Sequence, residues 1–295
     1  LTFYPSKVGE MVEEDHRPPR RAGYYLHQAV RNGLDPLRVA IEAAHEYGVK
    51  LFPQNRFVGP NLPPEHALYD HGGQFFGEHL AWRCAYPDGS PIRHLSFAYP
   101  GVREFYVRLL REWVEEYEAD GINLLFNRSW PLVYYEEPVC QAFQEQYGED
   151  LRRLQPAEVH ADVGRMSMDG PDLYFHFVRE EDERAQRARA SFVTRFLREI
   201  RTMLDEVGRK QDRYIPTCYL VMNTVSQCLS GAMDVATWIK EGLVDYLVVP
   251  MAQGPQYDGE LVRSQVREFV RLAEGSKTKI YPDAAPRRMP PSRYL

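Results

Sequence analysis

The fold is decided by one stretch of the sequence, DGINLLFNR, at residues 120–128. Its first two residues end a helical pattern that begins near Pro100, because Asp-Gly is a common stop signal. Its apolar centre, residues 122–126, predicts a strand buried on both faces. Asn127 and Arg128 follow directly as a polar strand end. This order is typical of an α/β protein with a parallel sheet.

The same alternation continues along most of the chain. We predict helices at residues 35–47, 100–117, 139–147, 172–207, 234–242 and 258–274. We predict strands at residues 49–52, 122–126, 214–221, 244–250 and 279–282. A (β/α)₈ barrel and an open doubly wound sheet both fit this order. Since no strand is followed by GxGxxG or GxxxxGK[ST], the barrel is favoured over a nucleotide-binding sheet.

The chain is expected to form one barrel domain over residues 1–295. Two stretches without a clear period interrupt it, at about residues 58–98 and 149–170. Long irregular stretches inside compact domains are usually functional or disordered. We therefore interpret both as loop excursions from the barrel.

Composition excludes several classes of protein. The net charge is −6 without a basic stripe, so we expect no nucleic-acid partner. No apolar run is long enough to cross a bilayer, and the four cysteines are too scattered for a disulfide framework. The 19 Tyr, 14 Phe and 4 Trp suit either a carbohydrate site or a large core. No leader pattern is present in the sequence, so its localisation stays open, as does a homo-oligomeric state.

Polar residues follow each predicted strand, where a barrel places its active site. They are Asn55 and Arg56, Asn127 and Arg128, Asn223, Gln253, and Asp283. Taken singly, such residues often mark only the start of a solvent-exposed loop. Taken together, they predict a polar mouth that binds substrate.

Two carboxyl groups in this set suit glycoside hydrolysis, which needs a pair of them flanking the bond. Glu136 lies between aromatic residues and Pro138, and Asp283 follows the last strand. A carboxyl group among aromatic rings has a raised pKa and can donate a proton. The alternative for Glu136 is a structural role at the start of the next helix, and for Asp283 a role in a turn.

The first excursion adds further candidates for substrate binding. These are Glu78, His79 and Trp82. A sugar could stack on the ring of Trp82, or on the rings of Trp130 and Tyr135 in the later loop. Asp70, His71 and His79 leave a metal-assisted hydrolase open as a weaker alternative. However, the sequence has no HExxH, so we expect no metal or other cofactor. It also has no GxSxG, so it offers no motif for a catalytic serine.

Several stretches in this order resemble the family-10-like glycoside hydrolases. They are EHLAWR (78–83), DGS (88–90), SFAYPGVR (96–103), DGINLLFNR (120–128), YEEP (135–138), GLVDYLV (242–248), YP (281–282) and RMP (288–290). The resemblance implies a (β/α)₈ barrel that acts on carbohydrate. It also implies that the first strands precede residue 1 and that the last follows residue 295.

This resemblance implies that Asn127 follows the fourth strand and Asp283 the seventh. In the wider clan of retaining barrel hydrolases those strand ends carry the acid/base and the nucleophile. Here the fourth strand ends in Asn127-Arg128 instead of Asn-Glu, and the seventh offers Asp instead of Glu. The leading hypothesis is still a hydrolase of O-glycosidic bonds in an oligo- or polysaccharide, and it uses Glu136 and Asp283 as its two carboxyl groups. The alternative is a carbohydrate-binding barrel without catalysis.

Overall fold

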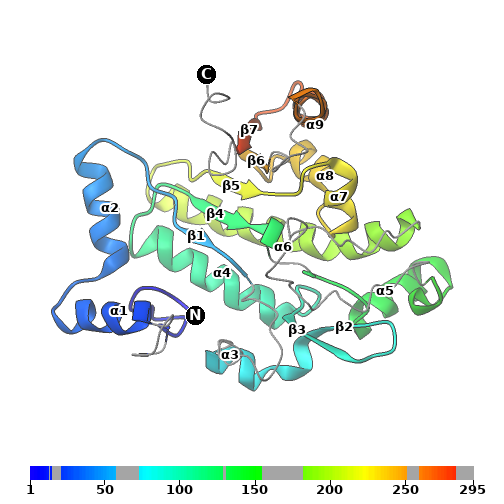
Figure 1. Cartoon of the computed structure of the whole chain (residues 1–295), viewed down its shortest axis with the longest axis horizontal. Coiled ribbons are helices and arrows are strands. Elements are labelled where there is room, and N and C mark those ends of the chain that lie inside the picture. The colour runs from blue at the N-terminus through cyan, green and yellow to red at the C-terminus, as the bar shows by residue number, and fades with distance from the viewer. Residues whose placement is uncertain are drawn as a thin grey trace.

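The structure is a computed structural model that describes residues 1–12, 14, 21–57, 73–128, 131–154, 182–250 and 259–283. Figure 1 shows its elements in chain order. The main helices are α1 (Arg21–Arg31), α2 (Pro36–Glu46), α3 (Gly73–Glu78), α4 (Pro100–Glu115), α5 (Glu137–Tyr147), α6 (Glu183–Lys210), α7 (Val225–Ser230), α8 (Val235–Lys240) and α9 (Gly259–Ala273). Short 3-10 helices are η1 (Leu80–Trp82), η2 (Phe126–Arg128) and η3 (Leu151–Arg153). The strands are β1 (Gln54–Asn55), β2 (Arg83–Ala85), β3 (Pro91–Leu95), β4 (Ile122–Leu125), β5 (Thr217–Leu220), β6 (Tyr246–Pro250) and β7 (Lys279–Asp283).

Five strands form one parallel sheet in the order β1-β4-β5-β6-β7. Each strand pairs with the next sheet strand along the chain, and the order never reverses. A doubly wound sheet reverses its order at a switch point, whereas a (β/α)₈ barrel keeps the order of the chain. The fold is therefore α/β of the barrel type, as predicted. Within the described residues, β1 and β7 are the two edges of the sheet and the barrel is not closed.

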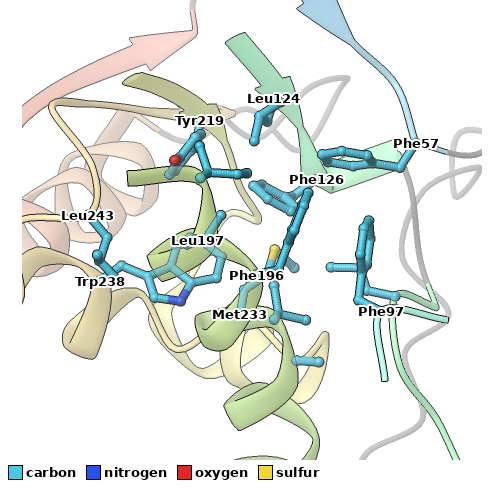
Figure 2. Packing of buried hydrophobic residues seen from close by; sticks show 14 of the residues in the cluster. Phe57, Phe97, Leu124, Phe126, Phe196, Leu197, Tyr219, Met233, Trp238 and Leu243 are labelled. Atoms are coloured by element: carbon cyan, nitrogen blue, oxygen red, sulfur yellow. The ribbon is translucent and has the colours of Figure 1, made fainter. Parts of the chain in front are cut away.

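The core lies between this sheet and helices α4, α6 and α8. Figure 2 shows its centre, where Phe126 lies 5.2 Å from Phe57, 5.4 Å from Trp238 and 5.5 Å from Tyr219, measured between ring centroids. Leu124, two residues before Phe126, points to the same side because side chains alternate along a strand. Burying each large apolar side chain stabilises the fold by about 1.5–3 kcal/mol. This packing fixes which face of the sheet meets the helices.

The helices begin and end at residues that the sequence marks. Asp35 accepts hydrogen bonds from the first turn of α2, and a proline stands at its first position. Asp182 caps α6 in the same way. Gly148 ends α5 with φ = 72°, a left-handed conformation that favours glycine.

Two aspartates, Asp120 and Asp245, connect neighbouring strands by hydrogen bonds at the amino end of the sheet. Asp120 Oδ2 accepts a hydrogen bond of 2.8 Å from Leu51 N–H, just before β1. Asp245 Oδ2 accepts one of 2.8 Å from Thr217 N–H, the first residue of β5, and its Oδ1 accepts one of 2.6 Å from Tyr214 OH. Each aspartate thus ties the start of its own strand to the start of the preceding strand in the sheet.

Several elements differ from the sequence predictions. The predicted loop at 58–98 contains α3, η1 and an antiparallel hairpin of β2 and β3. Helices α1 and α7 were not predicted, and the first strand lies at 54–55 rather than at 49–52. Most of the second excursion lies outside the described residues.

Candidate active site at the carboxyl ends of the strands

All five sheet strands are parallel, so their carboxyl ends meet at one edge of the sheet. The predicted mouth residues Asn127, Asn223 and Asp283 come from three of these ends. The register pairs Asp283 with Pro250, the last residue of β6. Asp283 is partly exposed.

Three buried amide oxygens at these ends have no hydrogen-bond partner among the described residues: Asn55 Oδ1, Asn127 Oδ1 and Asn223 Oδ1. Asn223 is only 8% exposed, and its Nδ2 donates a hydrogen bond of 3.1 Å to the carbonyl oxygen of Pro250. Because a carbonyl can only accept, this bond fixes which amide atom is the nitrogen. The remaining oxygen is therefore an acceptor that requires a donor.

Asn55 lies differently from its predicted role. The register pairs it with Leu124, which belongs to the core on the helix side. Paired residues of adjacent strands point to the same face, so Asn55 is directed toward the helices. Its neighbours Gln54 and Arg56 point to the opposite face. The predicted contact of Asn55 with substrate does not fit this register.

Two predicted residues, Trp130 and Gln253, lie outside the described residues. The backbone of Arg128 closes η2 after β4, but its side chain is outside the described part as well. Their predicted roles in substrate binding stay predictions.

Glu136 is the most enclosed carboxyl group among the candidates, at 2% exposure. Its oxygens both accept a hydrogen bond of 3.0 Å from Tyr134 N–H. Ser96 Oγ donates to Oε1, and Ala85 N–H donates to Oε2 at 3.3 Å. The β2–β3 hairpin and the residues after β4 thus hold this carboxyl group together.

Burial is the main influence on the protonation of Glu136. Removal from water raises its pKa, because the charged form loses hydration. The hydrogen bonds from Ser96 and from the Tyr134 and Ala85 backbone favour the charged form and offset part of this effect. The pKa stays above its ordinary value on balance. A carboxyl group of this kind can hold a proton closer to neutral pH, as a general acid must.

The aromatic candidate Tyr135 is enclosed. It is 1% exposed, and the guanidinium of Arg189 on α6 lies 5.7 Å from its ring centroid and 5.5 Å from that of Tyr134. The predicted stacking of a sugar on Tyr135 is therefore not possible in this arrangement. Both tyrosines instead connect the loop after β4 to α6.

Trp82 and His79 belong to a separate aromatic cluster on α3 and η1. Their ring centroids are 4.0 Å apart, with the planes inclined by 30°. A Cβ atom placed on Gly101, in the first turn of α4, would come within 2.4 Å of the indole. The ring of Trp82 thus packs against α4 but stays partly exposed, and its predicted stacking role stays a prediction. Glu78 is exposed and accepts a hydrogen bond of 2.6 Å from Gln74.

One comparison decides the family. The profile described as glycosyl hydrolase-like 10 matches residues 1–291. The chain belongs to the glycosyl hydrolase-like 10 family. No curated protein sequence matches it significantly.

Three solved structures show the kinds of enzyme to which this family member is similar. A family 18 N-acetylglucosaminidase from Paenibacillus barengoltzii is 15% identical, with a TM-score of 0.42 over 85% of this chain and 55% of the enzyme. A multi-modular chitinase from Paenibacillus sp. str. FPU-7 is 10% identical, with a TM-score of 0.45 over 92% and 25%. A family GH18 chitinase from Chromobacterium violaceum is 13% identical, with a TM-score of 0.33 over 83% and 28%. The chain spans about half of the first enzyme and about a quarter of the other two.

Within the part of this glycosyl hydrolase-like 10 protein that the structure describes, no group of three or more His, Cys, Asp or Glu could hold a metal ion. Asp70 and His71, the other members of the proposed metal set, lie outside that part. The same residues contain no helix that is long and apolar enough to cross a bilayer.

Sequence reasoning missed two residues of this region, Ser96 and Arg189. Ser96 lies 40 positions before Glu136, and only the hairpin brings them together. Arg189 lies within a charged helix whose pattern resembles a solvated face, yet it is 2% exposed. The motif SFAYPGVR contains Ser96 and was the one available signal for it.

Proposed function

We propose that this protein hydrolyses O-glycosidic bonds in an oligo- or polysaccharide at the carboxyl-end edge of its sheet. Glu136 is the general acid that protonates the leaving oxygen, and Asp283 is the second carboxyl group, acting as nucleophile or base. Membership of a glycosyl hydrolase-like family supports the reaction class. The observation that carries the assignment of the acid is the enclosed carboxyl group of Glu136, whose pKa is raised by burial.

The remaining strand-end residues are proposed to bind the sugar. Asn127 and Asn223 each have an amide oxygen with no partner among the described residues, and sugar hydroxyl groups supply the donors that such atoms require. Arg56 and Arg128 would bind hydroxyl groups or an acidic substituent of the sugar, since guanidinium pairs with anions in a two-pronged geometry. Gln253 and Trp130 complete the predicted set.

Glu136→Gln tests the proposed acid. We expect turnover of unactivated oligosaccharides to fall by about 100- to 10,000-fold, because glutamine cannot protonate the leaving group. Aryl glycosides with acidic phenol leaving groups need little protonation, so their hydrolysis should fall far less. The measurement is kcat/KM on both kinds of substrate, with thermal unfolding to show that the variant folds.

Glu137→Gln is the matched control. Glu137 is the adjacent carboxylate, but it is exposed and accepts a hydrogen bond of 2.7 Å from Arg152. Its loss should leave turnover near the wild-type value. Equal losses in both variants, or equal losses on both kinds of substrate, would exclude Glu136 as the acid.

One observation favours a second candidate function, carbohydrate binding without catalysis. Both oxygens of Glu136 already accept hydrogen bonds from the protein, as a purely structural carboxylate does. In that case the wild type binds an oligosaccharide without hydrolysing it, and Glu136→Gln binds it equally well. Calorimetric titration of both proteins, together with product analysis, separates the two functions.

A further inference from the structure

The hydroxyl group of Ser96 is held in one orientation. Ser96 is fully buried, and its Oγ accepts a hydrogen bond of 3.0 Å from the N–H of Ala98. A backbone N–H can only donate, so the single hydroxyl proton stays available for another partner. That partner is Oε1 of Glu136. Ser96 therefore donates to this carboxyl group in a fixed direction.

The backbone around Ser96 is fixed as well. Ser96 N–H donates a hydrogen bond of 2.8 Å to the carbonyl oxygen of Trp82, and Phe97 N–H donates one of 3.0 Å to that of Leu132. The second bond joins the end of the hairpin to the residues after β4. Tyr135 N–H, next to Glu136, donates a further bond of 3.0 Å to the carbonyl oxygen of Ala85 on β2. Ser96 and Glu136 thus lie on two segments that are joined by two backbone hydrogen bonds.

The pKa of Glu136 is governed by burial and hydrogen bonds rather than by the charges of the ionisable groups around it. Cys84 on β2, Tyr99 before α4 and Cys140 on α5 all have raised pKa values, chiefly through burial, so they stay uncharged near neutral pH. Glu137 is paired with Arg152, and Arg189 on α6 lies over the neighbouring tyrosine rings. Among the hydrogen bonds that offset burial at Glu136, the one from Ser96 has the largest effect.

We propose that Ser96 is a positioning residue, which orients Glu136 and sets the upper pH limit at which this carboxyl group still carries the proton for hydrolysis. The inference deepens the proposed function and rests on Glu136 as the general acid. A hydroxyl donor stabilises the ionised carboxylate, so its removal favours the protonated form. An acid that keeps its proton to higher pH extends activity in the alkaline direction.

Ser96→Ala tests this inference. We expect the alkaline limb of the kcat/KM profile to move to higher pH by about one unit, the size typical of losing a hydrogen bond to a charged group. Ser90→Ala is the control. Ser90 donates a hydrogen bond of 2.6 Å to Asp88 in the exposed turn of the same hairpin, away from Glu136. Its profile should match that of the wild type.

Two further variants keep the inference testable if the alanine variant does not fold. Ser96→Thr retains the hydroxyl group and should restore the wild-type limb. Ser96→Cys offers a weaker donor, so its limb should move in the same direction as that of the alanine variant. A folded alanine or cysteine variant with an unmoved limb overturns the proposal.

A measurement without substrate separates this inference from the proposed function. Carbon-13 labelling of glutamate carboxyl groups gives a signal for Glu136, identified by its loss in Glu136→Gln. We expect its titration midpoint to rise in Ser96→Ala and to be unchanged in Ser90→Ala. A raised midpoint in a protein without hydrolytic activity would support the role of Ser96 in setting protonation and refute the enzyme. An unchanged midpoint in a protein that hydrolyses its substrate would refute this role of Ser96 and support the enzyme.

Discussion

The two ends of the parallel sheet use polar side chains in opposite ways. At the amino end, Asp120 and Asp245 accept hydrogen bonds from the backbone of neighbouring strands. At the carboxyl end, Asn127 and Asn223 each bury an amide oxygen that has no partner among the described residues. The two aspartates at the amino end thus have hydrogen-bond donors, whereas the two asparagines at the carboxyl end retain unused acceptors.

We interpret this difference as a division between residues that stabilise the fold and residues that serve the proposed function. In barrels of this type the carboxyl ends of the strands carry the active site, and the amino ends contribute to stability. A buried acceptor without a donor costs free energy, which a ligand that brings the donor can recover. Substitutions at the two ends should therefore affect different quantities: turnover and carbohydrate binding at the carboxyl end, and the free energy of unfolding at the amino end.

The largest effect is expected at Asp283, at the carboxyl end of β7. Asp283→Ala should lower turnover by about 100-fold or more, because the second carboxyl group of the proposed pair is lost. The free energy of unfolding should change little, since the side chain is only partly buried. Steady-state kinetics and urea unfolding measure the two quantities.

Sodium azide sharpens this test. If Asp283 is the nucleophile, azide should restore turnover of an activated aryl glycoside by Asp283→Ala and yield a glycosyl azide. If Asp283 is the base of an inverting reaction, azide should also restore turnover and give a glycosyl azide that is inverted relative to the substrate. The two roles are separated by the sugar that the wild type releases, which keeps the anomeric configuration of the substrate if Asp283 is a nucleophile and inverts it if Asp283 is a base. Unaltered turnover in the alanine variant would remove Asp283 from the mechanism.

The second effect concerns the amino end. Asp245→Ala removes the acceptor for Thr217 N–H and for Tyr214 OH. We expect the free energy of unfolding to fall by about 2–4 kcal/mol, because bonds to a charged group are lost and a buried N–H remains unpaired. Carbohydrate binding by the folded variant should be unchanged. Urea unfolding and calorimetric titration provide the two readings.

Glu183→Ala serves as the control for this loss. Glu183 pairs with Arg187 at 2.5 Å on the surface of α6, where the two side chains are 64% and 54% exposed. Such pairs contribute at most about 1 kcal/mol. If both variants lost equal stability, the hydrogen bonds of Asp245 would stabilise the fold no more than an exposed ion pair does.

The sequence predicted the sheet better than the hairpin and the site. The strand at 122–126 was found because an apolar run lies between a helix stop and a polar pair. The run at 49–52 was misleading: its last residue, Phe52, packs against Tyr246, yet the ladder begins only at Gln54. Asp88-Gly89 is a common hairpin turn and could have revealed β2 and β3.

The roles of individual side chains depended on contacts between distant segments. Trp82 and Tyr135 have the composition of a sugar site, but packing encloses Tyr135 completely and holds part of the Trp82 ring against α4. Asn55 follows an apolar run, but the register turns it toward the helices. Neither enclosure nor register can be read from a local pattern, because both depend on which segments meet in the fold.

A third, smaller effect is expected at Asn223. Asn223→Leu removes both the buried acceptor and the bond to Pro250, so the two losses partly cancel and unfolding should change by about 1 kcal/mol or less. Oligosaccharide affinity should fall by about tenfold, the equivalent of one hydrogen bond. Asn32→Ala, an exposed residue just after α1, should alter neither quantity. Unchanged affinity in the leucine variant would place Asn223 outside the binding site.

The smallest effect is a pH dependence at Asp120. Burial tends to raise its pKa, but the hydrogen bond from Leu51 N–H and the contact of 2.8 Å with His45 Nε2 outweigh this, so its pKa is lowered on balance. A lowered pKa in the folded state stabilises the fold above the unfolded value of about 3.9, and this contribution fades as the pH falls through the folded value. Asp120→Asn should therefore be less stable than the wild type at pH 7.

The gap between Asp120→Asn and the wild type should close as the pH falls toward 3. Because the side chain is partly exposed, we expect a gap of at most about 1 kcal/mol at pH 7. Urea unfolding at pH 7, 5, 4 and 3 measures it, with Glu183→Gln as the comparison on the surface of α6. A gap that is constant across this range would mean that the carboxylate charge of Asp120 adds nothing to the stability of the fold. The charge of Asp120 would then not contribute to holding β4 against β1, and the contrast of the amino end with the carboxyl end would rest on Asp245.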